Sequence, residues 1–146
     1  MKKGFTLVEL LAVIIILGIL SLIAGTTVTT FLKKGKTDLY NQQLKNVELA
    51  CKNWGSENSD LIEEKFDSYN SIIVTIGYLQ DKGYIDDNIK NVKDNKKINQ
   101  NDIFIIITKS STSKKYDYEL LDEGFEDMKT NTNSFVFEIQ EEAWKM

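Results

Sequence analysis

The fold of this chain is decided near its start by residues 5–25, FTLVELLAVIIILGILSLIAG. Glu9 is the only charged residue in this stretch of sequence. An α-helix of about 20 apolar residues rises roughly 30 Å, which matches the hydrocarbon thickness of a bilayer. The segment is also longer than the apolar part of a secretory signal peptide. It therefore predicts one membrane-spanning helix that stays attached to the protein.

Glu9 does not fit a plain membrane anchor. An acidic side chain costs about 2.5–3.5 kcal/mol near the centre of a membrane helix and less near its end. Two explanations are open: Glu9 is hydrated at the level of the lipid headgroups, or it pairs with a cation. Cleavage after Gly4 would create such a cation, because the new amino terminus on Phe5 could pair with Glu9 of its own or a neighbouring chain.

The chain resembles type IV prepilins in the sequence MKKGFTLVE at residues 1–9, followed by the long apolar run. This resemblance implies that a prepilin peptidase cleaves after Gly4 and methylates the new amino terminus of Phe5. It implies that Glu9 neutralises the amino terminus of an adjacent subunit in a filament. Residues 1–4 would then be the leader, and residues 5–25 the transmembrane and filament-core helix.

The first helix lacks the proline that many bacterial pilins carry about midway along it, since the chain has no proline. Residues 25–30, GTTVTT, combine glycine with β-branched side chains, which are poor helix formers in an exposed setting. Two alternatives follow. The helix softens in this stretch, or it continues unbroken, stabilised by lipid or by neighbouring subunits.

Beyond Lys36 the pattern becomes periodic and predicts an amphipathic helix over residues 26–55 as the second half of the long helix. The face predicted to be buried carries apolar residues at helical spacing: Tyr40, Leu44, Val47, Cys51 and Trp54. Gly55 is the expected stop. Cys51 and Trp54 are expected in the core, and Cys51 as a small buried side chain rather than a reactive thiol.

Residues 56–146 predict a globular α+β head. Residues 58–70 suit a short helix or an irregular loop, and residues 75–85 a short helix with Thr75 as N-cap and Gly83 just past its end. The latter segment, ending in Gly-Tyr-Ile, is similar to a segment of pilin-like proteins of Gram-positive bacteria. Strands are expected at 103–108, 116–120 and 134–139, with a turn at 110–113. The fold class is therefore α+β, type IV pilin-like: a long helix on an antiparallel sheet of three or four strands.

The composition excludes several classes of site. The chain has 146 residues, a net charge of −4, one cysteine, and neither histidine nor arginine. Histidine-dependent catalysis, imidazole metal ligands and intramolecular disulfides are thereby excluded, and the acidic balance argues against nucleic acid. Residues 86–102 match no EF-hand pattern and are expected to form a solvated loop, although clustered oxygens leave calcium binding as an alternative. The acidic run at residues 117–127 is expected to be a solvated face rather than a catalytic pair, so no enzyme, catalytic residue, cofactor or metal is predicted.

The resemblance implies a filament subunit, a pilin or minor pilin serving adhesion, motility or surface contact. Its partners would be other pilin subunits, a prepilin peptidase, an assembly ATPase and a platform membrane protein. The precursor would cross the cytoplasmic membrane once, and the assembled pilus would lie at the cell surface. The alternatives are a pseudopilin of a type II secretion or competence system and a non-polymerising, signal-anchored extracytoplasmic binding domain.

Overall fold

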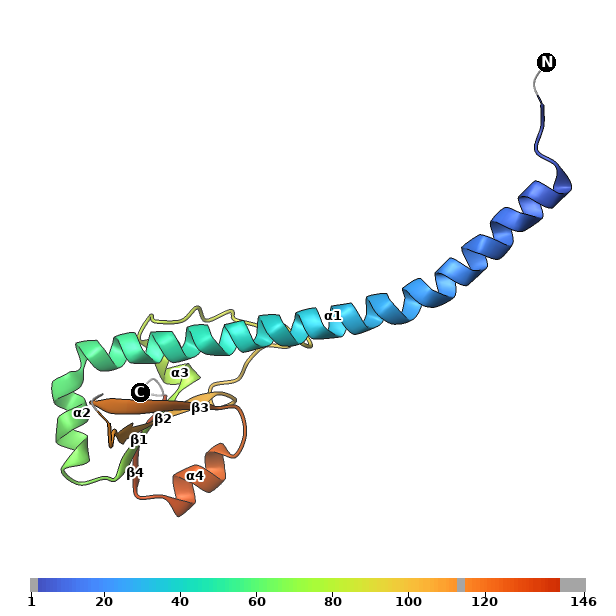
Figure 1. The fold of residues 1–146 in the computed structure, drawn as a ribbon. Helices are drawn as coiled ribbons and strands as arrows, with labels where there is room; N and C mark the ends of the chain where they lie inside the picture. Colours follow the sequence, from blue (N-terminus) through green and yellow to red (C-terminus); the bar gives the residue numbers. More distant parts are fainter. Residues whose placement is uncertain (1–2, 113–114, 140–146) are drawn as a thin grey trace. The chain divides into compact units, whose positions relative to one another are not determined.

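A computed structural model describes residues 3–112 and 115–139. Met1 and Lys2 of the expected leader and Ser113 of the expected turn lie outside the described residues. The chain divides into two compact units, Met1–Leu39 and Tyr40–Met146. The elements, in order, are α1 (Leu7–Glu57), α2 (Ser59–Phe66), β1 (Ser71–Thr75), α3 (Ile76–Asp81), β2 (Phe104–Lys109), β3 (Tyr116–Leu121), α4 (Phe125–Asn131) and β4 (Ser134–Phe137) (Figure 1).

The long helix α1 is helical at every residue from Leu7 to Glu57, including residues 25–30 and Gly35. Of the two sequence alternatives for residues 25–30, the structure therefore has the unbroken helix. The expected stop at Gly55 is wrong, because the helix runs two residues further. Gly55 is buried, and a Cβ there would collide with the Tyr118 hydroxyl, so this glycine serves the close approach of α1 to β3.

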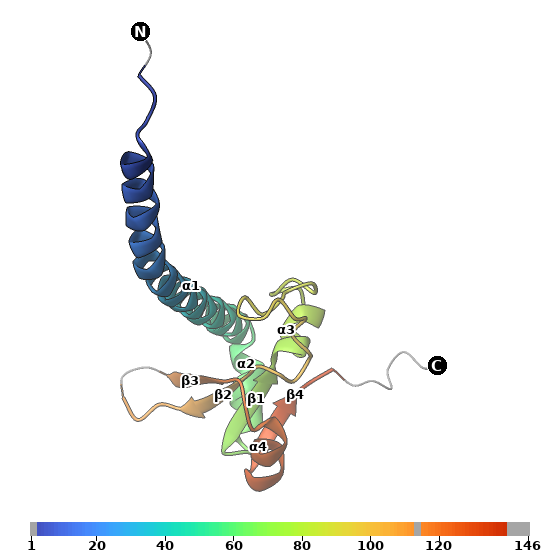
Figure 2. The same cartoon turned by 90° about the vertical axis from the view of Figure 1, so that its right-hand side faces the viewer.

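The predicted α+β fold is confirmed: α1 packs on a four-stranded sheet in the order β3-β2-β1-β4. Strand β2 pairs antiparallel with both β1 and β3. The expectation of a wholly antiparallel sheet is wrong for β4, which pairs parallel to β1 with Ser71 opposite Ser134 and Val74 opposite Phe137. Figure 2 shows the four strands of this mixed sheet side by side in this order.

The parallel pairing of β4 depends on α4, a helix that the sequence analysis does not predict; its first three residues belong to the acidic run expected to be a solvated face. Parallel neighbours need a crossover connection, and the segment containing α4 carries the chain from β3 at one edge of the sheet to β4 at the other. Phe125 anchors α4 by packing edge-on against Phe104, with ring centroids 5.4 Å apart. Figure 1 shows that α4 lies on the sheet face opposite α1, where this contact belongs to a second apolar cluster.

The core consequently has two layers. Val47, Cys51 and Trp54 of α1 are buried against one face of the sheet, where β2 contributes Ile105 and Ile107. The other face holds a smaller cluster of Ile73, Phe104, Ile106 and Phe125. Strand β2 is therefore covered on both faces, which explains its continuous apolar sequence.

The helix α3 forms as its capping sequence predicts. The Thr75 side chain accepts a hydrogen bond from the Tyr78 backbone N–H at 3.2 Å, and Gly83 follows the helix with a φ of +83°. Of the two alternatives for residues 58–70, a short helix or an irregular loop, the structure has the helix α2. The sequence reading missed β1, whose four consecutive buried residues Ile72–Thr75 show no alternation.

Candidate processing and assembly segment

The N-terminal end of α1 is closed by a reciprocal pair of hydrogen bonds. The Thr6 backbone N–H donates to Glu9 Oε2 at 2.9 Å, and the Glu9 backbone N–H donates to Thr6 Oγ1 at 3.3 Å. This arrangement is a capping box, which satisfies two backbone donors that a helix start otherwise leaves unpaired. Glu9 therefore has a structural role within its own chain, at the positive end of the helix dipole.

Thr6 is a residue of this segment to which the sequence reading assigned no role. Its signal was nevertheless present, because Thr6-Leu7-Val8-Glu9 has the threonine and glutamate spacing of a capping box. The reading weighed Glu9 as a charge in an apolar run and not as a cap. Of the two carboxylate oxygens of Glu9, only Oε2 accepts a hydrogen bond among the described residues.

The peptide between Gly4 and Phe5 lies outside secondary structure, two residues before α1 begins. Nothing lies within 4 Å of a Cβ built on Gly4, and the Phe5 side chain is 90% exposed. This peptide bond is therefore exposed and outside secondary structure. The structure thus places Gly4, Phe5 and Glu9 within one short segment at the start of α1.

C-terminal to this segment, α1 carries a long apolar surface that no other part of the unit Met1–Leu39 packs against. All large apolar side chains from Phe5 to Leu32 are exposed, Leu11, Ile19 and Phe31 among them. The helix is long and apolar enough to cross a membrane. An apolar surface of this extent marks a contact with lipid or with other proteins.

The threonines in this surface have their hydroxyl protons satisfied within the helix. Thr27 Oγ1 donates to the Ile23 carbonyl and Thr30 Oγ1 to the Thr26 carbonyl, each at 3.0 Å. Thr26 and Thr29 make similar bonds to carbonyls three or four residues earlier. A polar side chain whose donor is already bonded costs less to transfer from water to an apolar environment. The apolar surface therefore continues past residue 25 as far as Leu32.

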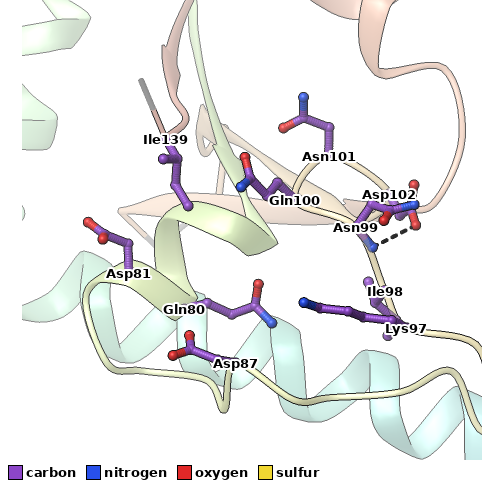
Figure 3. Close-up of a pocket in the computed structure, with 10 residues that line it drawn as sticks. All are labelled: Gln80, Asp81, Asp87, Lys97, Ile98, Asn99, Gln100, Asn101, Asp102 and Ile139. Carbon is purple, nitrogen blue, oxygen red and sulfur yellow. Dashed lines mark hydrogen bonds between the residues drawn. The ribbon is translucent and has the colours of Figure 1, made fainter. Parts of the chain in front are cut away.

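The head contains a polar pocket between α3 and the loop that precedes β2 (Figure 3). Its volume is about 640 Å³, and its lining includes the amides of Gln80 and Gln100 and the carboxylate of Asp87. Asp102 is held in this loop by accepting the Asn99 backbone N–H at 2.8 Å. The lining offers hydrogen-bonding groups, and the described part of the pocket holds no cysteine or serine nucleophile.

The loop 86–102 is ordered by local turns and by one side chain of α1. Gln43 donates from Nε2 to the Lys90 carbonyl at 2.6 Å and accepts the Val92 backbone N–H at 3.4 Å. The carboxylates of Asp86 and Asp94 each accept a backbone N–H two residues further along. These oxygens are thus occupied in shaping the loop. Among the described residues, no group of three or more cysteine, aspartate or glutamate side chains is placed to hold a metal ion.

Cys51 and Trp54 lie in the core, as their helical spacing predicts. Cys51 is fully buried, and burial raises the pKa of its thiol to about 12. The Trp54 ring packs against Phe137 and Tyr78, with centroid distances of 5.0 and 5.6 Å. Neither residue belongs to the N-terminal segment, and both serve the stability of the head.

Comparison with known proteins finds a family match in the N-terminal segment that contains Gly4, Phe5 and Glu9. Residues 1–25 match the family model described as the prokaryotic N-terminal methylation motif. Comparison with curated proteins and with solved structures found no match. The match covers residues 1–4, the capping box and the apolar helix up to Gly25, while the head is described by its structure alone.

Proposed function

Because the chain carries the prokaryotic N-terminal methylation motif, a type IV prepilin-like signal, we propose that it is the precursor of a filament subunit, a pilin or minor pilin. The observation that carries the proposal is the exposed apolar helix whose start combines the open Gly4–Phe5 peptide with the carboxylate of Glu9. Its function would then reside in the polymer, in adhesion, motility or surface contact.

Processing would create the positively charged partner that the Glu9 carboxylate otherwise lacks. Hydrolysis after Gly4 leaves a cationic amine on Phe5, and methylation of that amine keeps its positive charge. The Glu9 oxygen Oε2 already accepts the Thr6 N–H. Oε1 remains able to accept from the Phe5 amine of an adjacent subunit, so one carboxylate can cap its own helix and neutralise its neighbour. An ion pair of this kind in apolar surroundings is screened far less than one in water.

The motif implies assembly machinery in general. The specific partners proposed here are a prepilin peptidase, an assembly ATPase with its platform membrane protein, and other pilin subunits. The precursor would be anchored in the cytoplasmic membrane by α1, with the polymer displayed at the cell surface. The alternative, a pseudopilin of a type II secretion or competence system, would carry the same N-terminal motif.

The decisive experiment is the intact mass and N-terminal sequence of the protein recovered from its own cell surface. A chain that begins at a methylated Phe5 is the expected result, and Gly4→Ala should leave the leader attached and keep the protein in the membrane. A surface chain that still begins at Met1 would instead favour the non-polymerising anchored binding domain, whose ligand site would be sought in the pocket of Figure 3.

Glu9→Ala tests the assembly step separately from processing. This variant should be inserted and cleaved but should enter filaments poorly beside the wild-type protein. Glu64→Ala is the matched control, because it removes an exposed carboxylate of the head. Equal incorporation of Glu9→Ala and wild type would remove the charge-pairing role.

A further inference from the structure

Three lysines, Lys33, Lys34 and Lys36, follow directly after the exposed apolar surface of α1. All three are exposed, and none forms an ion pair within the described residues. We propose that these lysines bind the headgroups of anionic phospholipids in the leaflet that receives the far end of the apolar helix. The inference goes beyond filament assembly and requires only that α1 be inserted in a membrane.

The length of the helix places the lysines at the correct depth. Leu7 and Lys33 are 26 residues apart in α1, which corresponds to about 39 Å at a rise of about 1.5 Å per residue. A bilayer is about 30 Å thick in its hydrocarbon core and about 40–45 Å with both headgroup layers. With Leu7 at the near edge of the hydrocarbon and the helix upright, the Lys33 backbone therefore lies about 9 Å beyond the far edge of the hydrocarbon, just outside a headgroup layer that is about 5–8 Å thick.

The direction of the side chains brings the ammonium groups back towards the lipid. In an α-helix the Cα–Cβ bonds tilt towards the N-terminus, which for these lysines is the membrane side. Long lysine side chains also keep their methylene groups on apolar surface while the charge reaches the headgroup layer. The three ammonium groups can thus meet lipid phosphates even where their backbone lies just beyond them.

A shallow groove on α1 begins at Lys34, the one lysine of the three that lines it, and continues towards the hydrocarbon. It is lined by Thr26, Thr27, Thr30, Phe31 and Lys34 and has a volume of about 440 Å³. The hydroxyl protons of its threonines are committed to the helix's own carbonyls. Lys34 is therefore the donor left for a phosphate, and the Phe31 ring, 76% exposed, offers apolar surface to an acyl chain.

Charge complementarity distinguishes this patch from the rest of the protein. The whole chain has a net charge of −4, so an anionic membrane repels it on average. Residues 26–39 carry three lysines against one acidic residue, Asp38. A preference of this protein for anionic lipid must therefore come from a local cationic patch and not from its overall charge.

The test measures lipid selectivity in the full-length protein. The protein is reconstituted in phosphatidylcholine bilayers, and electron spin resonance of spin-labelled phosphatidylglycerol and phosphatidylcholine gives the ratio of their association constants. We expect a preference for phosphatidylglycerol that falls severalfold in the variant K33Q/K34Q/K36Q, since each lysine near an anionic surface contributes up to about fivefold. Added salt should reduce the wild-type preference. Glutamine is nearly as good a helix former as lysine, so α1 should persist in the variant.

The matched control is K45Q/K82Q/K96Q, which removes three exposed lysines of the second compact unit, Tyr40–Met146, and changes the net charge equally. It should keep the wild-type ratio. An unchanged ratio in K33Q/K34Q/K36Q, or an equal loss in the control, would overturn the proposal.

A third outcome would assign the lysines to a different partner. If the lysine variant reduces self-association of the protein in pure phosphatidylcholine, the patch binds an acidic face of a second copy and the lipid proposal fails. None of these experiments measures filament formation. A result that overturns the lipid proposal therefore leaves the proposed filament function untouched.

Discussion

Glu9 caps the start of its own helix, and we propose that it also pairs with an amine of another chain. Its Oε2 accepts the Thr6 N–H at 2.9 Å, which orients the carboxylate along the start of α1. A glutamate held in this way has lost rotamer freedom before any partner arrives. The later ion pair with an amine of another chain would then cost less entropy to form.

Thr6→Val tests the other half of this cap. The substitution removes the oxygen that accepts the Glu9 N–H, and loss of an N-cap side chain costs about 0.5–2 kcal/mol of helix stability. We expect hydrogen exchange at the first amides of α1 to accelerate by about 2- to 30-fold in detergent micelles. Thr6→Ser keeps the hydroxyl and should exchange as the wild type does; equal protection in the valine variant would show that the cap contributes nothing there.

Trp54→Ala should be among the most damaging single changes in the head. Trp54 is 2% exposed and packs against Tyr78 and Phe137, so truncation leaves a large cavity. Such changes cost about 3–5 kcal/mol, measurable as a lower thermal unfolding midpoint of the head. Asn53→Ala, on the exposed side of the same helix, is the control and should change stability by less than about 0.5 kcal/mol. An unchanged midpoint for the Trp54 variant would mean that its ring is not in the core.

At the scale of elements, α3 is fastened to the loop before β2 by a close backbone approach. Its Gly77 N–H donates to the Gln100 carbonyl at 2.9 Å, and the preceding Ile76 N–H donates to the Ile103 carbonyl at the same distance. A Cβ at position 77 would lie 2.7 Å from the Gln100 Cβ and 2.9 Å from its Cα. Glycine is needed here because the two backbones leave no room for a side chain.

Gly77→Ala should therefore separate α3 from this loop. We expect a loss of about 1–3 kcal/mol in the stability of the head, the usual cost of overpacking, read from its thermal midpoint. Adding Gln100→Gly in the same chain removes the Cβ contact and should recover part of the loss. If Gly77→Ala is as stable as wild type, the loop moves freely and the close approach has no energetic consequence.

At the scale of the whole molecule, burial of ionisable groups makes the head sensitive to alkali. Burial raises the pKa of Cys51 to about 12 from 9.0. Burial also raises the pKa of Tyr40 and of Tyr118 to about 12 from 10.0, and for Tyr40 the hydrogen bond to Asp122 adds to the effect. Each group loses its proton more readily in the unfolded chain, so the unfolded state gains from rising pH.

These pKa values set both the direction in which stability changes with pH and the pH range of that change. Stability should be unaffected by these groups below about pH 9 and should then fall by up to about 1.4 kcal/mol per pH unit as the Cys51 thiol ionises in the unfolded chain. The fall should steepen above about pH 10, where the two tyrosines join. The thermal midpoint between pH 8 and 11 measures it. Cys51→Ala should remove the decline between about pH 9 and 10 and keep the later one; an unaltered profile would assign the early decline to other groups.

Much of this architecture could be predicted because it depends on residues that are close together in the sequence. Helix α1, its buried face at Tyr40, Val47, Cys51 and Trp54, and the Thr75 cap of α3 each depend on spacings of three or four positions. The N-terminal site is equally local, since Gly4, Phe5, Thr6 and Glu9 lie within six residues. Local hydrogen bonds and helical periodicity suffice to specify such features.

The sequence by itself therefore determined the apolar helix, the N-terminal methylation motif, the Thr75 cap of α3 and the α+β class. Only the tertiary structure decided the strand β1, the helix α4, the parallel pairing of β4 and the attachment of the 86–102 loop to Gln43. These elements are four to seven residues long, or in the case of the loop irregular, and are too short to be stable alone. Their stability comes from burial against segments far away in the chain, such as Phe125 on Phe104, which no local spacing reveals.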